Sequence, residues 1–367
     1  MADPRLTKLA DLMVNYSVAV QPGDWVVVRG DVISEPLVTE VVRRVVKAGG
    51  KPTILVSSDG ITEAFMSEAG DEQLKWVSPV SKMLYDDADV FINIRATSNT
   101  RSLTGIDPEK ERIRAVAQRE LTETFMERSA TKDLRWVLTQ FPCPAYAQEA
   151  DMSLREFEDF VYGAVFADKD DPIAEWQKIH DEQEKIIEWL KGKKIVTVKS
   201  PNADLSLSIE GRTFINSDGK NNMPSGEIFT GPVEDSANGW VEFTYPAIRS
   251  GREVDGVRLE FEDGKVVKAS AEKNEAYLIS QLDSDEGSRY LGEFAIGTNY
   301  GIQQFTKSIL FDEKIGGSFH MAVGAGYPET GSKNKSSIHW DFICDIKEDS
   351  EVRVDGELLY KDGEFQI

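Results

Sequence analysis

The first part of the chain alternates between two hydrophobic patterns. Apolar residues recur at helical spacing over 6–16 and again over 35–48, where the pattern ends at two glycines. The apolar runs 25–28, 52–56 and 90–94 are short and rich in valine and isoleucine, as is typical of buried strands. A strand, a helix and another strand in this order predict a parallel sheet with a right-handed crossover.

Helices dominate the prediction for the middle of the chain. Helical patterns follow Asp107-Pro108, begin again at Ser153, and continue in a longer stretch from Asp171-Pro172 to about Gly192. Residues 136–139 are the one strand predicted between these helices. The helical stretch that ends near Gly192 also closes the first predicted domain.

The pattern changes after Lys194. Short segments with alternating apolar and polar residues, separated by Asn, Asp, Gly and Ser, predict antiparallel strands at 195–198, 205–209, 240–244, 257–261 and 266–270. Residues 262–265 carry a hairpin signal, and 274–282 predict a helix. We therefore expect an α/β N-terminal domain with a parallel sheet over 1–193, and an α+β, largely antiparallel C-terminal domain over 194–367.

Composition narrows the classes of function. The length of 367 residues exceeds what a single hydrophobic core usually supports, which agrees with two domains. The formal charge of −22 argues against binding of nucleic acid or of anionic membranes. No apolar run approaches a membrane span, and the chain leads directly into an amphipathic helix, so we expect a cytoplasmic protein.

Several common catalytic and binding signatures are missing from the sequence. It contains neither G-x-G-x-x-G nor G-x-x-x-x-G-K-[ST], so the N-terminal domain is predicted to be structural rather than nucleotide-binding. There is no G-x-S-x-G, and Cys143 and Cys344 belong to no recognisable catalytic or C-x-x-C motif. Serine or cysteine catalysis and a disulfide framework are therefore disfavoured.

Two of the three histidines lie near carboxylates in the C-terminal part of the chain. His339 and Asp341 are two residues apart, so on a strand both side chains leave from one face, while Trp340 points into the core. His320 lies in an apolar, strand-like segment, where a satisfied core histidine is the alternative reading.

Glu227 and Glu293 each follow a glycine and precede large apolar residues. A glutamate in such surroundings is costly to bury without a cation, and surface exposure is the alternative. Histidine nitrogen and carboxylate oxygen together are the donor set of hydrolytic metal sites, which predicts such a site here.

Five ordered motifs resemble those of the thermophilic aminopeptidase family of co-catalytic metallopeptidases. They are Met223-Pro224-Ser225-Gly226-Glu227-Ile228-Phe229-Thr230-Gly231-Pro232, Leu291-Gly292-Glu293, Leu310-Phe311-Asp312-Glu313, His320 through Pro328, and His339-Trp340-Asp341. The segments from Tyr16 to Asp24 and from Lys47 to Gly50 are also similar to that family, so the resemblance covers nearly the whole chain.

The resemblance implies a set of site residues and partners. The implied ligands of two divalent ions, of Zn, Co, Mn or Mg, are Glu227, Glu293, His320, His339 and Asp341, with Glu293 as the bridge and Glu313 as a further ligand. Tyr327 and Glu293 are the implied catalytic residues. The family resemblance also implies peptide substrates and a homodimer. The segment from Pro328 to His339 is shorter than in many members, which affects the wall of the pocket.

The implied reaction is release of N-terminal residues from peptides by a metal-activated water. Tyr327 would donate a hydrogen bond to the oxyanion, and Glu313 or Glu293 would carry the proton. Two alternatives stay open: a peptide- or metal-binding protein that has kept the shell without turnover, and a metal-dependent hydrolase of another small substrate.

Overall fold

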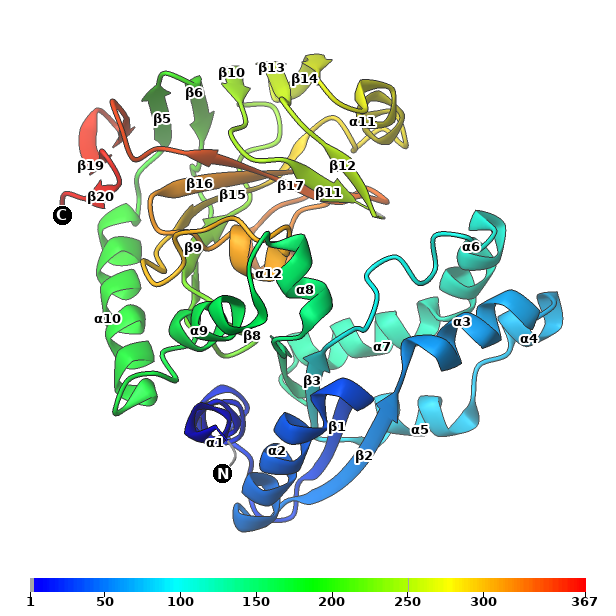
Figure 1. Cartoon of the computed structure of the whole chain (residues 1–367). Coiled ribbons are helices and arrows are strands. Elements are labelled where there is room, and N and C mark those ends of the chain that lie inside the picture. The colour runs from blue at the N-terminus through cyan, green and yellow to red at the C-terminus, as the bar shows by residue number, and fades with distance from the viewer. Residues whose placement is uncertain (1–2, 250) are drawn as a thin grey trace. The chain divides into compact units, whose positions relative to one another are not determined.

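The chain forms two compact units in the computed structural model, which describes residues 3–249 and 251–367. One unit runs to Ile173 and also takes in Gly219–Pro224; the other comprises Ala174–Asp218 and Ser225–Ile367 (Figure 1). The long helix α10 (Pro172–Leu190) thus lies almost wholly in the second unit, whose core includes its residues Ile186 and Leu190. The domain boundary predicted near residue 193, at the end of this helix, stays a prediction.

The first unit is built on a five-stranded sheet with the order β2-β1-β3-β4-β8. Every neighbouring pair is parallel, which confirms the predicted parallel sheet. The strands are β1 (Trp25–Asp31), β2 (Lys51–Ser57), β3 (Val90–Arg95), β4 (Arg135–Gln140) and β8 (Asn222–Met223). The last strand comes from the segment that returns to this unit after α10, and its two residues are too few to show any period.

Helices of the first unit follow the predicted order, with additions. They are α1 (Pro4–Asp11), continued by a π-helix (Leu12–Ser17), then a 3-10 turn (Val32–Ser34), α2 (Glu35–Lys47), α3 (Asp59–Glu68), α4 (Asp71–Lys75), α5 (Pro79–Asp87), α6 (Pro108–Ala117), α7 (Arg119–Ala130), α8 (Pro144–Glu149) and α9 (Leu154–Ala164). Helices α3, α4 and α5 were not predicted. Each has a single buried residue, Met66, Leu74 or Leu84, so no apolar stripe marks it in the sequence.

The second unit contains two large antiparallel sheets, as predicted for the C-terminal part, and a two-stranded antiparallel sheet formed by β11 and β12. The larger has the order β14-β13-β10-β6-β5-β18-β19-β20, and the smaller β17-β16-β15-β9-β7. The larger sheet comprises β5 (Ile195–Ser200), β6 (Ala203–Ser208), β10 (Asn238–Glu242), β13 (Arg258–Glu262), β14 (Lys265–Ser270), β18 (Glu351–Val354), β19 (Glu357–Lys361) and β20 (Glu364–Phe365). The predicted hairpin joins β13 to β14, where Asp263 and Gly264 both have positive φ, as a tight primed turn requires.

The smaller sheet comprises β7 (Ile215–Ser217), β9 (Glu227–Thr230), β15 (Leu291–Gly297), β16 (Ser318–Gly324) and β17 (His339–Asp345). The remaining elements of this unit are β11 (Ala247–Arg249), β12 (Arg252–Val254), α11 (Glu275–Leu282), α12 (Ile309–Asp312) and a 3-10 turn (Pro328–Thr330). Among the residues that the structure describes, no helix combines the length and the apolar character that a bilayer crossing needs.

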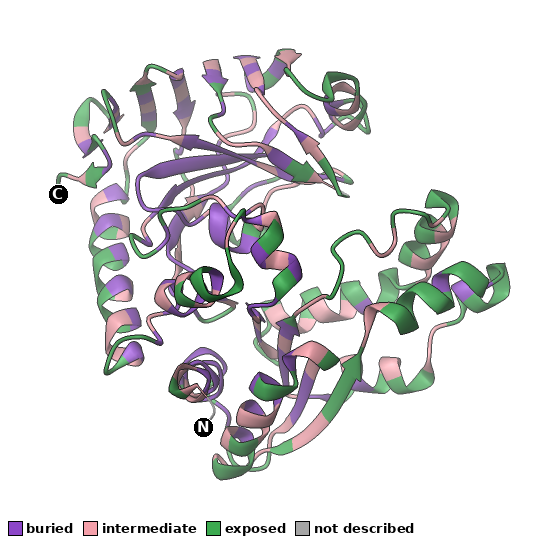
Figure 2. Ribbon diagram, viewed as in Figure 1, coloured by how far each residue is buried: buried purple, intermediate pink, exposed green. Residues whose placement is uncertain are grey.

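One hydrophobic core fills the space between the larger and the smaller sheet of the second unit. It joins Val196, Leu205 and Val241 of the larger sheet to Phe294 and Met321 of the smaller one. Strands β15 and β16 are buried along their whole length (Figure 2). Both faces of the smaller sheet are therefore shielded, and the face turned away from this core holds buried polar residues, among them Glu293 and His320.

Candidate metal centre

The smaller sheet directs apolar side chains to the face that packs on the hydrophobic core and polar side chains to its other face. On β17, Trp340 is 3% exposed and belongs to the hydrophobic core, so its neighbours His339 and Asp341 leave from the other face. The predicted placement of this pair on one strand face is confirmed. By the same alternation, His320 of β16 lies on the face away from the core, whereas its neighbours Phe319 and Met321 point into the core.

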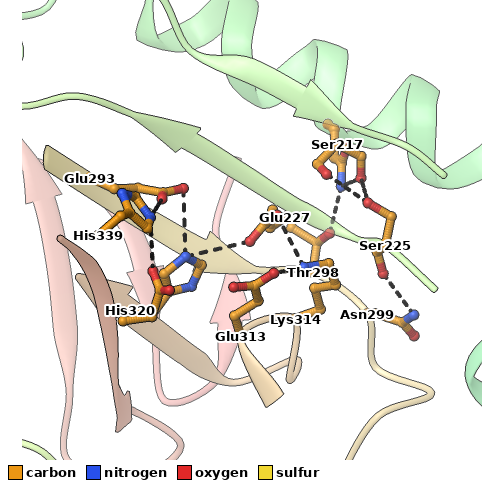
Figure 3. Close-up of polar contacts among 12 residues, drawn as sticks. Ser217, Ser225, Glu227, Glu293, Thr298, Asn299, Glu313, Lys314, His320 and His339 are labelled. Carbon is orange, nitrogen blue, oxygen red and sulfur yellow. Dashed lines mark hydrogen bonds and ion pairs between the residues drawn. The ribbon is translucent and has the colours of Figure 1, made fainter. Parts of the chain in front are cut away.

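Neighbouring strands bring the glutamates to the same face. Glu293 of β15 pairs with Ala322, which in turn pairs with Asp341 of β17. Glu227 is the first residue of β9, opposite Gly297 at the end of β15. Both glutamates are 5% exposed, so the alternative of surface exposure is wrong for each of them. Residues far apart in sequence thus form one cluster because their strands are adjacent (Figure 3).

Glu293 contacts both histidines, one with each carboxylate oxygen. Its Oε1 lies 3.7 Å from Nε2 of His320, and its Oε2 lies 3.2 Å from Nε2 of His339 (Figure 3). A carboxylate that turns its two oxygens to two different nitrogen donors has the arrangement expected of a bridge between two ions.

Each histidine has a second carboxylate partner of its own. Nε2 of His320 lies 3.5 Å from Oε2 of Glu227, and Nε2 of His339 lies 3.4 Å from Oδ1 of Asp341. These contacts define two groups whose ligand atoms lie within 4.8 Å of one another: Glu227, Glu293 and His320, and Glu293, His339 and Asp341. Glu293 is common to both.

Buried oxygens without hydrogen bonds show how well a cation would fit. Oε2 of Glu227 and Oδ1 of Asp341 are inaccessible to solvent, and neither accepts a hydrogen bond from any residue that the structure describes. Such orphaned anionic atoms are costly unless a cation satisfies them. Together with two imidazole nitrogens they form the mixed N/O donor set that Zn²⁺, Co²⁺ and Mn²⁺ accept. The residues therefore fit divalent metal ions.

His339 is held in the tautomer that a ligand needs. Its Nδ1 donates a hydrogen bond to the carbonyl oxygen of Ala325 at 2.7 Å, so Nε2 is the nitrogen that faces the carboxylates and that would bind an ion once its proton is lost. Tyr327 packs against the same ring, with centroids 5.1 Å apart, and against Phe229, with centroids 5.4 Å apart. The predicted catalytic tyrosine therefore lies beside the cluster.

Glu313 and Lys314 complete the polar surroundings. Glu313 follows α12 and forms a further group with His320 and Asp341, within the same 4.8 Å limit. Lys314 has no solvent exposure, and its Nζ contacts both Glu313 and Oε1 of Glu227, the latter at 3.3 Å (Figure 3). Sequence reasoning missed this lysine, because a lysine that follows a glutamate in a polar turn usually indicates a solvated surface.

Hydrogen bonds behind β9 fix the position of Glu227. The side-chain amide of Asn299 donates to the carbonyl oxygen of Ser225, and the Ser225 hydroxyl donates to the carbonyl oxygen of Ser217. Gly226 between them has a φ of +110°, and a Cβ there would lie 2.7 Å from Cβ of Asn299. Only glycine allows this approach, which explains the glycine before the glutamate.

Burial and charge determine the protonation of the cluster. Burial opposes ionisation of Glu293, yet its contacts with the two histidines lower its pKa to about 2. Burial disfavours the imidazolium forms, but the carboxylates outweigh it and raise the pKa of His320 to about 9 and that of His339 to about 12. Protons and divalent ions thus compete for the same nitrogens, so ion binding should release protons and should weaken as the pH falls.

The pair Glu313 and Lys314 titrates differently. Burial raises the pKa of Glu313 to about 7, although the neighbouring ammonium of Lys314 opposes this change. Burial also disfavours the charge of Lys314, but Glu227 and Glu313 outweigh it and raise the pKa of this lysine. In the metal-free protein Lys314 is therefore charged at neutral pH, whereas Glu313 is able to gain or lose a proton there.

Gly292 leads to a testable prediction about the geometry of the site. The register of β15 against β16 shifts between Leu291 and Glu293, and a Cβ at Gly292 would lie 2.2 Å from the carbonyl oxygen of Ala325. Gly292→Ala should push these strands apart, lower the free energy of unfolding by about 1–3 kcal/mol and weaken metal binding. Chemical denaturation and a metal titration measure the two effects.

A glycine without steric neighbours provides the control. Beyond its chain neighbours and the backbone of its own helix, Gly163 of α9 has no atom within 4 Å of an added Cβ, so Gly163→Ala should raise stability by about 0.5–1 kcal/mol and leave metal binding unchanged. Equal behaviour of the two variants would contradict the steric role assigned to Gly292.

Comparison with known proteins identifies the family. The model of the thermophilic metalloproteases (M29) matches residues 2–365. The chain belongs to this family. The resemblance that the sequence motifs indicate is confirmed, and with it the prediction of a metal-dependent peptidase that uses divalent ions.

Relatives in the thermophilic metalloprotease family are similar over their full length. Aminopeptidase 2 of Geobacillus stearothermophilus is 29% identical over 98% of this chain and 95% of its own, and aminopeptidase T of Thermus thermophilus is 25% identical over the same shares. The solved structure of wild-type AmpT from Thermus thermophilus has a TM-score of 0.86 at 23% identity and covers 99% of both chains. The predicted fold class is thus confirmed.

A more distant structural match shows that proteins of this fold differ in their named activities. A 2,5-dihydroxypyridine dioxygenase from Pseudomonas putida KT2440 matches with a TM-score of 0.58 at 14% identity, over 100% of this chain and 98% of that one. This likeness concerns the fold alone. Since that protein is named a dioxygenase, the fold does not specify the reaction, which depends on the side chains of the site.

Proposed function

We propose that this member of the thermophilic metalloprotease family is a metal-dependent aminopeptidase, which releases N-terminal residues from peptides at a two-ion site. The observation that carries the proposal is the position of Glu293, whose two oxygens face two different histidines. One ion position would be formed by Glu293, His339 and Asp341, and the other by Glu227, Glu293 and His320. The relatives named aminopeptidases support this activity.

Glu313 is the further ligand of the proposed shell. Its group with His320 and Asp341 is compatible with its proposed role as a further ligand. One of its oxygens is held by Lys314, so the other, Oε2, is free to point to an ion or to a reacting group. With a pKa near 7, this carboxylate is also suited to take a proton from water and to return it to the leaving amine.

Two divalent ions in this shell would lower the pKa of a water molecule and polarise the carbonyl of the scissile bond. The protein's own groups would do the rest. The free α-amino group of the peptide would bind to an ion or to a carboxylate of the site, which would restrict cleavage to the first residue. The Tyr327 hydroxyl, beside His339, would donate a hydrogen bond to the developing oxyanion.

Substrates with free and blocked N-termini test the proposal directly. The metal-loaded protein should release the first residue from unblocked peptides and from aminoacyl p-nitroanilides, and should leave the N-acetylated forms of the same compounds intact. Cleavage of blocked peptides at an equal rate, or release of acid from simple esters without any peptide cleavage, would favour another metal-dependent hydrolase instead.

Tyr327→Phe separates an enzyme from a protein that binds peptides without turnover. Removal of one oxyanion donor should lower kcat by about 10²–10³-fold. Because the ring still packs on His339 and Phe229, KM and the affinity for a slowly cleaved peptide should change little. Steady-state kinetics and a competition assay measure both quantities.

A second tyrosine serves as the matched control. The hydroxyl of Tyr360 donates to the carbonyl oxygen of Gly363 at 2.6 Å in the larger sheet, so Tyr360→Phe should reduce stability and leave kcat unchanged. An unchanged kcat in Tyr327→Phe as well would remove the tyrosine from the mechanism.

Assembly and location complete the proposal. The family resemblance supports a homodimer, for which light scattering coupled to size exclusion should give twice the mass of the chain. A cytoplasmic location is proposed from the composition and is tested by fractionation of cells that express the tagged protein.

A further inference from the structure

The two halves of the ligand cluster differ in one respect: only one of them contains a fixed cation. Lys314 has no solvent exposure, and its Nζ contacts Oε1 of Glu227 at 3.3 Å as well as Glu313. Glu227 belongs to the group with Glu293 and His320, while Glu313 belongs to the group with His320 and Asp341. The ammonium therefore lies among the carboxylates on the Glu227 side (Figure 3).

The other half has no such cation at its ligand atoms. Among residues 3–249 and 251–367, the ion pairs of His339 are with Glu293 and Asp341, and no lysine or arginine forms an ion pair with Asp341. Arg249 does approach His339, but its Nη1 donates to the backbone carbonyl oxygen, on the strand rather than on the ring. In the group of Glu293, His339 and Asp341, therefore, no lysine or arginine that the structure describes offsets the carboxylates, and the imidazolium of His339 is a charge that a bound ion displaces.

We propose that the ammonium of Lys314 is a built-in cation that makes the two ion positions unequal. The position formed by Glu293, His339 and Asp341 fills first. The position formed by Glu227, Glu293 and His320 fills second and more weakly, because an ion there must share Glu227 with a positive group a few ångströms away. This inference rests on the ligand assignment of the proposed function and adds an order of binding to it.

Burial is what makes the competition unavoidable. An exposed lysine would swing into solvent when an ion arrives, but a side chain without solvent exposure has no open path to water. Its contacts with Glu227 and Glu313 also hold one oxygen of each carboxylate. Lys314 is therefore a positioning residue as well, since it turns Oε2 of Glu227 to His320.

A titration of the metal-free protein with Co²⁺ tests the proposal. Calorimetry and the visible absorption of the bound ion measure the binding. The wild-type protein should bind one ion tightly and a second at least about tenfold more weakly. Lys314→Met and Lys314→Gln should tighten the second ion by at least about tenfold and leave the first unchanged. Glutamine retains hydrogen-bond donors for both carboxylates, so agreement of the two variants assigns the effect to the charge.

A surface lysine gives the matched control for loss of a positive charge. Lys268 of β14 is 67% exposed and pairs with Glu260, so Lys268→Met should leave both affinities unchanged. Circular dichroism and thermal melts of each metal-free variant establish that it is folded before titration. If Lys314→Met fails this requirement, Lys314→Gln carries the test alone.

The outcomes separate this inference from the proposed function. Two ions of equal affinity in the wild-type protein, or a second affinity that is unchanged or weaker in both Lys314 variants, would overturn the role of Lys314 even if the protein is an active aminopeptidase. Unequal binding that responds to Lys314 in a protein that cleaves no peptide would uphold the role of Lys314 and defeat the proposed reaction. Failure to bind any divalent ion would defeat both.

Discussion

Removal of divalent ions is expected to abolish the release of N-terminal residues, and addition of Zn²⁺, Co²⁺ or Mn²⁺ is expected to restore it. The loss should be at least about 10³-fold in kcat, because activation of water and polarisation of the carbonyl together contribute several kcal/mol to the barrier. The assay is hydrolysis of an aminoacyl p-nitroanilide before dialysis against a chelator, after it, and after each ion is returned.

Stability supplies an independent readout of the same experiment. The orphaned oxygens of Glu227 and Asp341 gain a partner when an ion binds, so the melting temperature should rise with ion concentration. Circular dichroism of the chelated protein distinguishes loss of the ion from loss of the fold. Full activity in a preparation with no metal detectable by elemental analysis would refute a metal-dependent mechanism.

Replacement of Glu293 is expected to have the largest effect of any single substitution. Glu293→Gln keeps the size of the side chain but removes the charge that the two proposed ion positions would share. Both ions should therefore bind more weakly, and kcat/KM should fall by at least about 10³-fold at subsaturating metal. Elemental analysis after gel filtration and steady-state kinetics at several metal concentrations measure the two effects.

A glutamate of the larger sheet provides the comparison. Glu351 of β18 pairs with Arg353 near the surface, and Glu351→Gln should change kcat/KM by less than about twofold. If Glu293→Gln lost only one of the two ions, Glu293 would be a ligand of one position, and the bridging role would pass to another carboxylate.

Local patterns in the sequence were enough to predict the fold class and many of its elements. The strand at 25–28 and the helix at 35–48 are marked by period and by the glycines after the helix, and both exist as β1 and α2. The turn at Asp263-Gly264 is marked by residue types that tolerate positive φ. Elements without an internal hydrophobic period could not be predicted from the sequence. Helices α3 to α5 bury one residue each, and β8 has two residues in all.

The site shows the same division between local and distant information. The pairing of His339 with Asp341 follows from strand parity alone, since neighbours two apart share a face wherever the strand lies. The contacts of Glu227 with His320 and of Glu293 with both histidines depend instead on the strand order of the smaller sheet. No spacing in the sequence encodes that order. Only the resemblance to a family connected these residues beforehand.

The sequence by itself determined the types of element, the donor atoms available for a metal, and the family to which the chain belongs. The tertiary structure alone decided that Glu293 faces two histidines and that Lys314 is buried among the carboxylates. The physical reason is that secondary structure depends on neighbours in the chain, whereas burial and ion pairing depend on what lies across the sheet. A lysine next to a glutamate has the same local pattern on a surface as in a metal centre.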